Sequence, residues 1–272
     1  MIRLMMIVNQ PEIARFVTQN GVDRVFVDLE CIGKSERQGH LDTWISRHVP
    51  ADISRVREAI GSAQLLVRLN PWHDGSVDEI EDALSRGADI LMLPMFREIV
   101  ELERFCRTVR GRVPVIPLVE TAEAFGRLSE VARTDGVGEV FIGLNDLHLS
   151  LGMRFMFEPL ANGMLDKASD QLKAAGKPFG FGGVARVGEG LLPAERILGE
   201  HARLGSTAVI LSRTFHRQAA TLDEIRQQMD FALETQRLQQ AYAGFLHASS
   251  EEIEANRREV KRIVAMLMEK SG

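Results

Sequence analysis

The sequence predicts a single (β/α)8 TIM barrel, over residues 1–235, with a C-terminal helical extension over residues 236–272. Eight short runs of Val, Ile, Leu and Met alternate with longer segments of helical period. The runs lack strict polar alternation, which is typical of strands buried on both faces of a parallel sheet. Eight strand–helix units in roughly 220 residues favour closure into a barrel. No Gly-x-Gly-x-x-Gly follows the first run, so a doubly wound open sheet has less support.

Each predicted strand is an apolar run bounded by polar residues, Gly or Pro. The eight runs are 4–8, 24–29, 65–69, 90–93, 113–119, 139–142, 178–181 and 207–211. The predicted helices place apolar residues three or four positions apart, and they are 11–19, 50–60, 77–85, 98–109, 123–131, 159–174, 191–204 and 222–233. Glycines follow several of them, as expected at helix ends. Strand–helix alternation of this kind implies right-handed βαβ units.

The C-terminal extension exceeds what a minimal barrel needs. The run from Ser249 to Glu252 has the pattern of a capping box, and a final helix with an apolar stripe follows it. That stripe must cover other apolar surface. It packs either on its own barrel or on a neighbouring subunit, and the sequence leaves both open.

Composition excludes several classes of protein. A net charge of −5 and a pI near 5.9 argue against a nucleic-acid-binding surface, which would be basic. No stretch of ~18 uncharged apolar residues predicts a membrane span. The N-terminal residues are predicted to form a first strand and not a signal peptide. Two cysteines, Cys31 and Cys106, fit a reducing compartment, so we expect a cytoplasmic protein.

The active site of such a barrel lies at the C-terminal ends of its strands. The polar residues that end the apolar runs are Asn9, Asp28, Glu30, Arg68, Asn70, Glu120, Asn145, Asp146 and Arg213. No histidine is among them, and carboxylates without imidazole or thiolate partners suit Mg2+ or Mn2+ better than zinc.

Glu120 and Asp146 are the predicted metal ligands. They end consecutive strands, whose backbones should lie ~5 Å apart. Two bare carboxylates at that separation would repel each other, and a bound dication removes the penalty. The alternative is that each carboxylate caps the following helix or pairs with an arginine.

Arg68 and Glu30 are predicted catalytic residues. A buried arginine at a strand end needs an anionic partner. Its planar fork suits a substrate carboxylate or an enolate oxygen, although an ion pair with Glu30 or Glu120 is the other interpretation. By strand alternation, Glu30 faces the same way as Asp28. Arg68 and the strand-end amides Asn70 and Asn145 are the predicted substrate contacts.

Two further segments have open interpretations. The connection after Glu30 is long and polar, and it carries His40 and His48. Connections above ~12 residues are uncommon unless they are functional or disordered. Glycines at 180, 182, 183, 188 and 190 follow the seventh run; they favour either a phosphate site or ordinary tight turns.

These residues resemble the HpcH/HpaI aldolase and citrate lyase beta-subunit family. The resemblance covers roughly residues 1–215, and its pieces occur in the family's order. They are GVDRVFVDLE at 21–30, VRLN at 67–70, GADILMLP at 87–94, VET at 119–121, FIGLNDL at 141–147 and SLG at 150–152. The specificity of the resemblance comes from the ordered set and not from any single piece.

The resemblance implies a carbon–carbon lyase that binds Mg2+ or Mn2+ through Glu120 and Asp146. It also implies that Arg68 contacts a 2-oxo acid or a CoA thioester and that an enolate forms during aldol or Claisen-type cleavage. Positive charge placed where the enolate develops would stabilise it. Family members are commonly trimers or hexamers that exchange a C-terminal helix, so we expect a homo-oligomer.

One departure concerns the general base. The family's 2-oxo acid aldolases carry Glu-His-Ala-Pro after the second strand, whereas Cys31 follows Glu30 here. The Asp-Leu-Glu at 28–30 looks more like the citrate lyase branch. We predict His40 as the base, with His48 or a metal-bound water as alternatives. The competing functional hypotheses are a related enolate chemistry and a non-catalytic barrel that binds a ligand or partner in a biosynthetic assembly.

Overall fold

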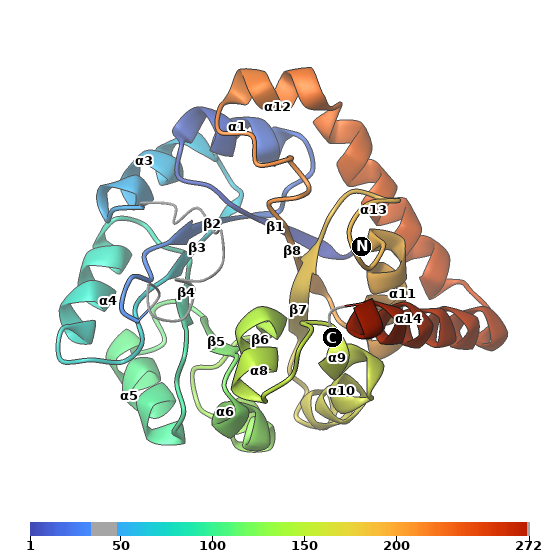
Figure 1. Ribbon diagram of the computed structural model, residues 1–272. Coiled ribbons are helices and arrows are strands. Elements are labelled where there is room, and N and C mark those ends of the chain that lie inside the picture. Colours follow the sequence, from blue (N-terminus) through green and yellow to red (C-terminus); the bar gives the residue numbers. More distant parts are fainter. Residues whose placement is uncertain (34–47, 271–272) are drawn as a thin grey trace.

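A computed structural model describes residues 1–33 and 48–270, and it shows a closed barrel of parallel strands in the order β1 to β8 (Figure 1). The strands are β1 (Arg3–Ile7), β2 (Arg24–Asp28), β3 (Gln64–Arg68), β4 (Ile90–Leu93), β5 (Val115–Val119), β6 (Val140–Ile142), β7 (Phe179–Val184) and β8 (Ala208–Leu211). The predicted (β/α)8 barrel with C-terminal helices is confirmed. β7 runs three residues beyond the predicted strand, and its register on β8 shifts between Gly180 and Gly183.

Helices surround the barrel. Those of the described residues are α1 (Pro11–Gln19), α3 (Ala51–Ala59), α4 (Ser76–Ser85), α5 (Ile99–Val109), α6 (Ala122–Gly126), α7 (Leu128–Arg133), α8 (Leu144–Ser150), α9 (Glu158–Ala161), α10 (Met164–Ala174), α11 (Ala194–Leu204), α12 (Leu222–Gln228), α13 (Phe231–Leu246) and α14 (Ser250–Lys270). None of these helices is long and apolar enough to cross a membrane.

Three predicted helices are each divided in two. The break between α9 and α10 falls at Gly163, whose φ of +87° cannot continue a right-handed helix. The break between α12 and α13 falls at Asp230, whose side chain accepts the backbone N–H of Leu233 and starts a new helix. The break between α6 and α7 falls at Arg127, which has a non-helical ψ. The division after residue 235 stays a prediction, and α13 crosses it.

Two apolar layers hold the barrel together. Strand residues alternate between them: Leu4 and Met6 pack toward the helices, whereas Met5 packs inside the barrel. The inner layer consists of Met5, Phe26, Leu66, Ile90, Met92, Ile116, Leu118, Phe141 and Ala208. This layer fills the interior with side chains, so the barrel is a packed core and not a pore.

The N-terminal ends of the strands, which we call the barrel floor, carry a buried ion pair. Arg24 at the start of β2 is 2% exposed, and its Nη2 lies 3.1 Å from Oε2 of Glu139. Arg3 of β1 donates to the same oxygen at 3.0 Å, and Oε1 of Gln64 accepts from Arg24. Burial lowers the pKa of Arg24, and the Glu139 carboxylate opposes that shift. The pair therefore keeps a charged guanidinium stable inside the protein.

We expect Glu139→Gln to lower the free energy of unfolding by about 3 kcal/mol, because it leaves a buried guanidinium without a counter-charge. Urea denaturation followed by circular dichroism measures the change. The matched control is Glu123→Gln, which removes the exposed ion pair with Arg97 and should cost at most about 1 kcal/mol. Equal losses in the two variants would contradict a special role for the floor pair.

A second buried group, His201 on α11, gives the fold a pH dependence. Its ring stacks on Phe181 with centroids 3.7 Å apart, and its Nδ1 lies 2.8 Å from Oγ of Ser206. Within the described residues, Nε2 has no hydrogen-bond partner. Burial lowers the pKa of His201 from 6.5 to about 3. Below pH 6.5 the unfolded chain takes up a proton that the folded chain does not, so stability falls as the pH falls from 6.5 toward 3.

At pH 5 this difference amounts to about 2 kcal/mol relative to pH 7.5. We expect His201→Phe, which keeps an aromatic ring against Phe181, to lose this component of the pH dependence. Urea midpoints of both proteins at the two pH values measure it. Parallel pH profiles for the parent and the variant would show that another group is responsible.

The C-terminal helices pack on their own barrel. Helix α13 lies on α11, and α14 lies on α11 and α9. The approach of α14 is close: a Cβ added at Gly199 would lie 2.5 Å from Nδ2 of Asn256. That amide donates to the carbonyl of Arg196 at 3.1 Å and to Oε1 of Glu200 at 3.3 Å. Within one chain the final helix covers its own barrel, and the packing of this helix on a neighbouring subunit stays a prediction.

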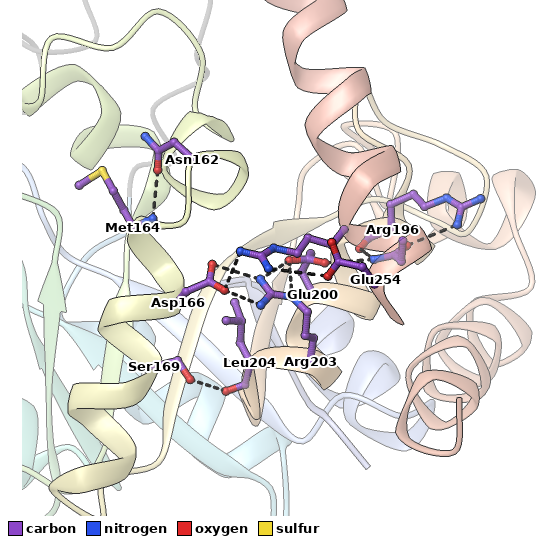
Figure 2. Close-up of polar contacts among 11 residues, drawn as sticks. Asn162, Met164, Asp166, Ser169, Arg196, Glu200, Arg203, Leu204 and Glu254 are labelled. Atoms are coloured by element: carbon purple, nitrogen blue, oxygen red, sulfur yellow. Dashed lines mark hydrogen bonds and ion pairs between the residues drawn. The ribbon is translucent and has the colours of Figure 1, made fainter. Parts of the chain in front are cut away.

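An ion network joins α10, α11 and α14 beside this contact (Figure 2). Asp166 of α10 pairs with Arg203 of α11 at 2.6 Å and with Arg257 of α14 at 3.3 Å. Arg203 also pairs with the buried Glu200 at 2.6 Å. The network fixes α14 against two helices of the barrel. The predicted homo-oligomer, a trimer or hexamer, stays a prediction.

Candidate active site

The C-terminal ends of the strands form the mouth of the barrel, and the predicted charged residues gather there. Asp28 ends β2, Arg68 ends β3, and Glu120 directly follows β5. Asp146 lies in the first turn of α8, the short helix after β6. Glu120 interacts electrostatically with Arg68, Asp146 and Glu30. The fold therefore brings side chains from four separate parts of the chain, at the ends of β2, β3, β5 and β6, into one charged cluster.

Arg68 is held by Asp28 in a bidentate ion pair. Nε and Nη2 of Arg68 donate to Oδ1 and Oδ2 of Asp28, both at 2.8 Å. The two residues are direct partners in the register of β2 and β3. Nη2 also lies 3.3 Å from Oε2 of Glu30, and the guanidinium carbon lies 5.5 Å from the ring centroid of Phe26. Such a fork fixes both the position and the plane of the guanidinium.

The surroundings of Arg68 keep its guanidinium group protonated. Burial by itself would lower the pKa of the guanidinium, but the charge and hydrogen bonds of Asp28 raise it. Glu30 and Glu120 raise the pKa further, so that it lies above its usual range. Nη1 makes no hydrogen bond within the described residues. Arg68 can therefore present a fixed cation with a remaining donor to a ligand.

The surroundings of Glu120, in contrast to those of Arg68, disfavour its charged form. It is 3% exposed, and its Oε1 accepts the backbone N–H of Met95 at 3.1 Å. Gly143 faces it so closely that an added Cβ would lie 2.9 Å from Oε2. Burial raises the pKa of Glu120 well above 4.5, and Asp146 and Glu30 raise it further. Arg68 and the Met95 N–H lower it, but they do not offset the burial.

This carboxylate chemistry fits a magnesium-type ion. In residues 1–33 and 48–270, no three His, Cys, Asp or Glu side chains gather closely enough to form a metal cage. Mg2+ does not need one, because it usually keeps several waters and binds one or two carboxylates. A cation beside Glu120 and Asp146 would offset the repulsion and burial that disfavour the Glu120 anion. The pair therefore fits Mg2+ or Mn2+ and lacks the nitrogen and sulfur ligands typical of zinc.

The remaining predicted residues take different positions. Glu30 is 6% exposed, and its backbone N–H donates to Oδ1 of Asp28 at 3.2 Å. His48 lies beside the same strand end, where its Nδ1 accepts the backbone N–H of Asp28 at 2.9 Å. Asn145 lies half-buried in α8, one residue before Asp146. His40 lies outside the described residues.

Asn70 is engaged in local structure. Its Oδ1 accepts the backbone N–H groups of Cys31 and Ile32 at 2.9 and 3.0 Å, and its Nδ2 donates to Oε1 of Glu79 at 2.7 Å. Because both ends of the amide are occupied, Asn70 fixes the start of the segment after β2. Its predicted substrate contact would require one of these hydrogen bonds to be exchanged.

Sequence reasoning missed two features of the site. Asp28 was not assigned as the partner of Arg68, although each is the fifth residue of a five-residue strand, in β2 and β3. His73 was also missed, because it follows β3 by five positions and does not end a run. Its Nε2 lies 3.1 Å from Oε1 of Glu79, next to Asn70. A search of strand–helix connections for histidines would have found it.

The fold and the position of this cluster define a (β/α)8 barrel of the kind that carries its active site at the C-terminal strand ends. Residues 3–200 match the HpcH/HpaI aldolase/citrate lyase family, and the chain belongs to that family. The resemblance inferred from the sequence is confirmed. Membership in a family of aldolases and citrate lyases supports a lyase. No curated protein sequence matches the chain significantly.

Solved structures share the fold at low sequence identity. An HpcH/HpaI aldolase/citrate lyase family protein from Burkholderia cenocepacia J2315 superposes with a TM-score of 0.62 and 18% identity, over 83% of this chain and 95% of that one. The citrate lyase beta subunit of M. tuberculosis, complexed with oxaloacetate and magnesium, gives 0.58 and 19%, over 88% and 96%. The HpcH/HpaI aldolase of Desulfitobacterium hafniense DCB-2 gives 0.59 and 16%, over 78% and 86%.

Proposed function

We propose that this protein is a divalent-metal-dependent carbon–carbon lyase that acts on a 2-oxo acid or an acyl thioester through an enolate. The observation that carries the proposal is the cluster at the mouth of the barrel. A clamped, permanently charged Arg68 lies beside Glu120, whose own charge is disfavoured by burial and by Asp146. This arrangement offers positive charge to a ligand and a place for a cation at the same end of the barrel.

Arg68 is the residue proposed to bind the reacting carbonyl group. Asp28 and Glu30 fix its Nε and Nη2, which leaves Nη1 for a carboxylate or carbonyl oxygen. As the carbon–carbon bond breaks, negative charge develops on that oxygen, and a pre-oriented guanidinium stabilises it without reorganisation. Asn145, one residue before Asp146, is the proposed second substrate contact.

Glu120 and Asp146 are the proposed ligands of Mg2+ or Mn2+. When bound, such an ion supplies Lewis-acid stabilisation to the same developing charge. Oxygen donors of this type and number match its coordination preference. The solved M. tuberculosis citrate lyase beta subunit contains magnesium and oxaloacetate, which supports the choice of this ion and of a small 2-oxo acid as the first probe.

Glu30 and His40 are proposed to handle protons. Glu30 lies buried against Arg68, where it can orient the guanidinium or accept a proton through an intervening water. His40 comes from the polar connection after β2 and stays our predicted general base. A positioned acid or base of this kind typically contributes about 10²–10⁴-fold to a rate.

The test is turnover of oxaloacetate by the metal-stripped protein, followed as Mn2+ or Mg2+ is added back. Decarboxylation of oxaloacetate needs the same enolate stabilisation as carbon–carbon cleavage. We expect activity that depends on the added ion, and then activity on one member of a panel of hydroxy-2-oxo acids and acyl-CoA thioesters. If no compound of the panel is turned over, with or without added metal, the lyase proposal is wrong. That result would favour the non-catalytic, ligand-binding alternative.

A further inference from the structure

A cleft lies outside the barrel wall, between α4 and α5, which are neighbours in the outer ring of helices (Figure 1). It has a volume of about 330 Å3, and Trp72, Val77, Glu81, Arg104, Arg107 and Arg110 line it. It is shallow and widely open to solvent, so a ligand would lie on it and would not be enclosed. None of the residues proposed for the lyase site lines this cleft, so it is a separate feature of the molecule.

The cleft carries an excess of positive charge. Arg104, Arg107 and Arg110 are exposed, and within the described residues none of them forms an ion pair. The acidic lining residue, Glu81, is already paired with Arg112 at 2.6 Å. The chain as a whole has a net charge of −5. Three unpaired arginines around one hollow are therefore a local reversal of the protein's charge.

The dipole of helix α5 explains the positions of only some of these arginines. Cations are favoured in the last turn of a helix, and the effect fades beyond that turn. Arg107 and Arg110 lie at the end of α5, but Arg104 lies five residues before its last residue, Val109. The dipole also gives no reason for an indole in the same hollow. A ligand that is both anionic and flat accounts for the arginines and for Trp72 together.

Trp72 supplies the flat surface. It is half-buried against the core, and Val77 beside it is 48% exposed. Aromatic side chains stack on nucleobases irrespective of base identity, because every base has a π-face. Arginine guanidinium groups bind phosphate oxygens in a bidentate manner. The cleft therefore offers an indole ring for a base and guanidinium groups for phosphates.

We propose that this cleft binds a nucleoside diphosphate or triphosphate, with its phosphates on Arg104, Arg107 and Arg110 and its base on Trp72. The proposal does not depend on the lyase function. Trp72 belongs to the β3–α4 connection, in which the neighbouring His73 contacts Glu79 and, through it, Asn70 at the barrel mouth. A ligand on Trp72 therefore contacts the segment that supports the other site.

Isothermal titration calorimetry of the unmodified chain with ADP at low ionic strength tests the proposal. We expect saturable binding of one ADP per chain with a dissociation constant below about 1 mM, weakened by added salt. Arg104→Gln and Arg107→Gln should each weaken binding about tenfold, since each removes a charge-assisted contact. Arg133→Gln, at an exposed arginine on α7, is the matched control and should bind as the parent does.

Fluorescence separates the base from the phosphates. The chain contains two tryptophans, Trp44 and Trp72, so Trp44→Phe leaves Trp72 as the reporter. ADP is expected to quench it, whereas inorganic pyrophosphate should compete with ADP without quenching. Absence of binding at about 1 mM ADP would overturn the proposal. So would equal binding of ADP and adenosine, or equal affinities for the Arg104, Arg107 and Arg133 variants.

Discussion

Glu120→Gln is expected to lower metal-dependent turnover by about a thousandfold, because it removes a charged ligand of the proposed cation. The glutamine side chain keeps the shape of glutamate, and its Oε1 can still accept the Met95 N–H. Steady-state decarboxylation of oxaloacetate with Mn2+ measures the loss. Calorimetric titration of Mn2+ into the parent and the variant shows whether the loss accompanies metal binding.

The same substitution is expected to lower turnover but to raise the stability of the metal-free protein. Because the folded-state pKa of Glu120 is raised above its usual value, the charged carboxylate opposes folding, and the stability lost in this way grows as the pH rises past about 4.3. We therefore expect the metal-free variant to melt at a higher temperature than the metal-free parent at pH 8. Added Mn2+ should raise the melting temperature of the parent alone.

Glu123→Gln is the matched control for both measurements, because Glu123 is exposed on α6 and pairs with Arg97. It should leave metal binding and turnover unchanged. A Glu120→Gln protein that binds Mn2+ and turns over oxaloacetate like the parent would remove Glu120 from the metal site.

Arg68→Lys is expected to lower kcat at least about a hundredfold, with a smaller change in KM. An ammonium group cannot span both oxygens of Asp28 and still hold a donor in the plane of the reacting carbonyl. The positive charge remains, so the variant isolates geometry from charge. Initial rates over a range of oxaloacetate concentrations separate kcat from KM.

The control for this variant is Arg112→Lys, in the exposed bidentate pair with Glu81. It should leave both kinetic constants unchanged. Circular dichroism and thermal melts establish that Arg68→Lys is folded, since Asp28 loses a planar partner in a buried position. Parental kcat in folded Arg68→Lys would mean that the clamp by Asp28 has no catalytic purpose.

The barrel could be predicted from the sequence because burial on both faces of a strand leaves continuous apolar runs. Periodicity does not report local helix breaks in the same way. Gly163 and Asp230, at two of the breaks, lie between helices that both bury apolar residues, so apolar spacing does not mark the break. The short α8 was missed because seven residues give too few repeats, although it carries Asn145 and Asp146.

The candidate site could be predicted in part. Polar residues at strand ends pointed to Arg68, Glu120 and Asp146, and the structure gathers these three. The ion pair of Arg68 with Asp28 depends on the register between two strands, which no single-chain pattern reports. The raised pKa of Glu120 depends on how closely neighbouring segments pack on it, which sequence spacing does not measure.

The filled interior of the barrel determines how ligands of the proposed reaction reach and leave the site. Side chains of the inner layer block any route through the axis, and Arg24 and Glu139 close the far end. The reactant and product of the proposed reaction would then enter and leave through the mouth of the barrel. A product that dissociates slowly would then block substrate binding. A higher product concentration in solution would lower the rate at which substrate enters.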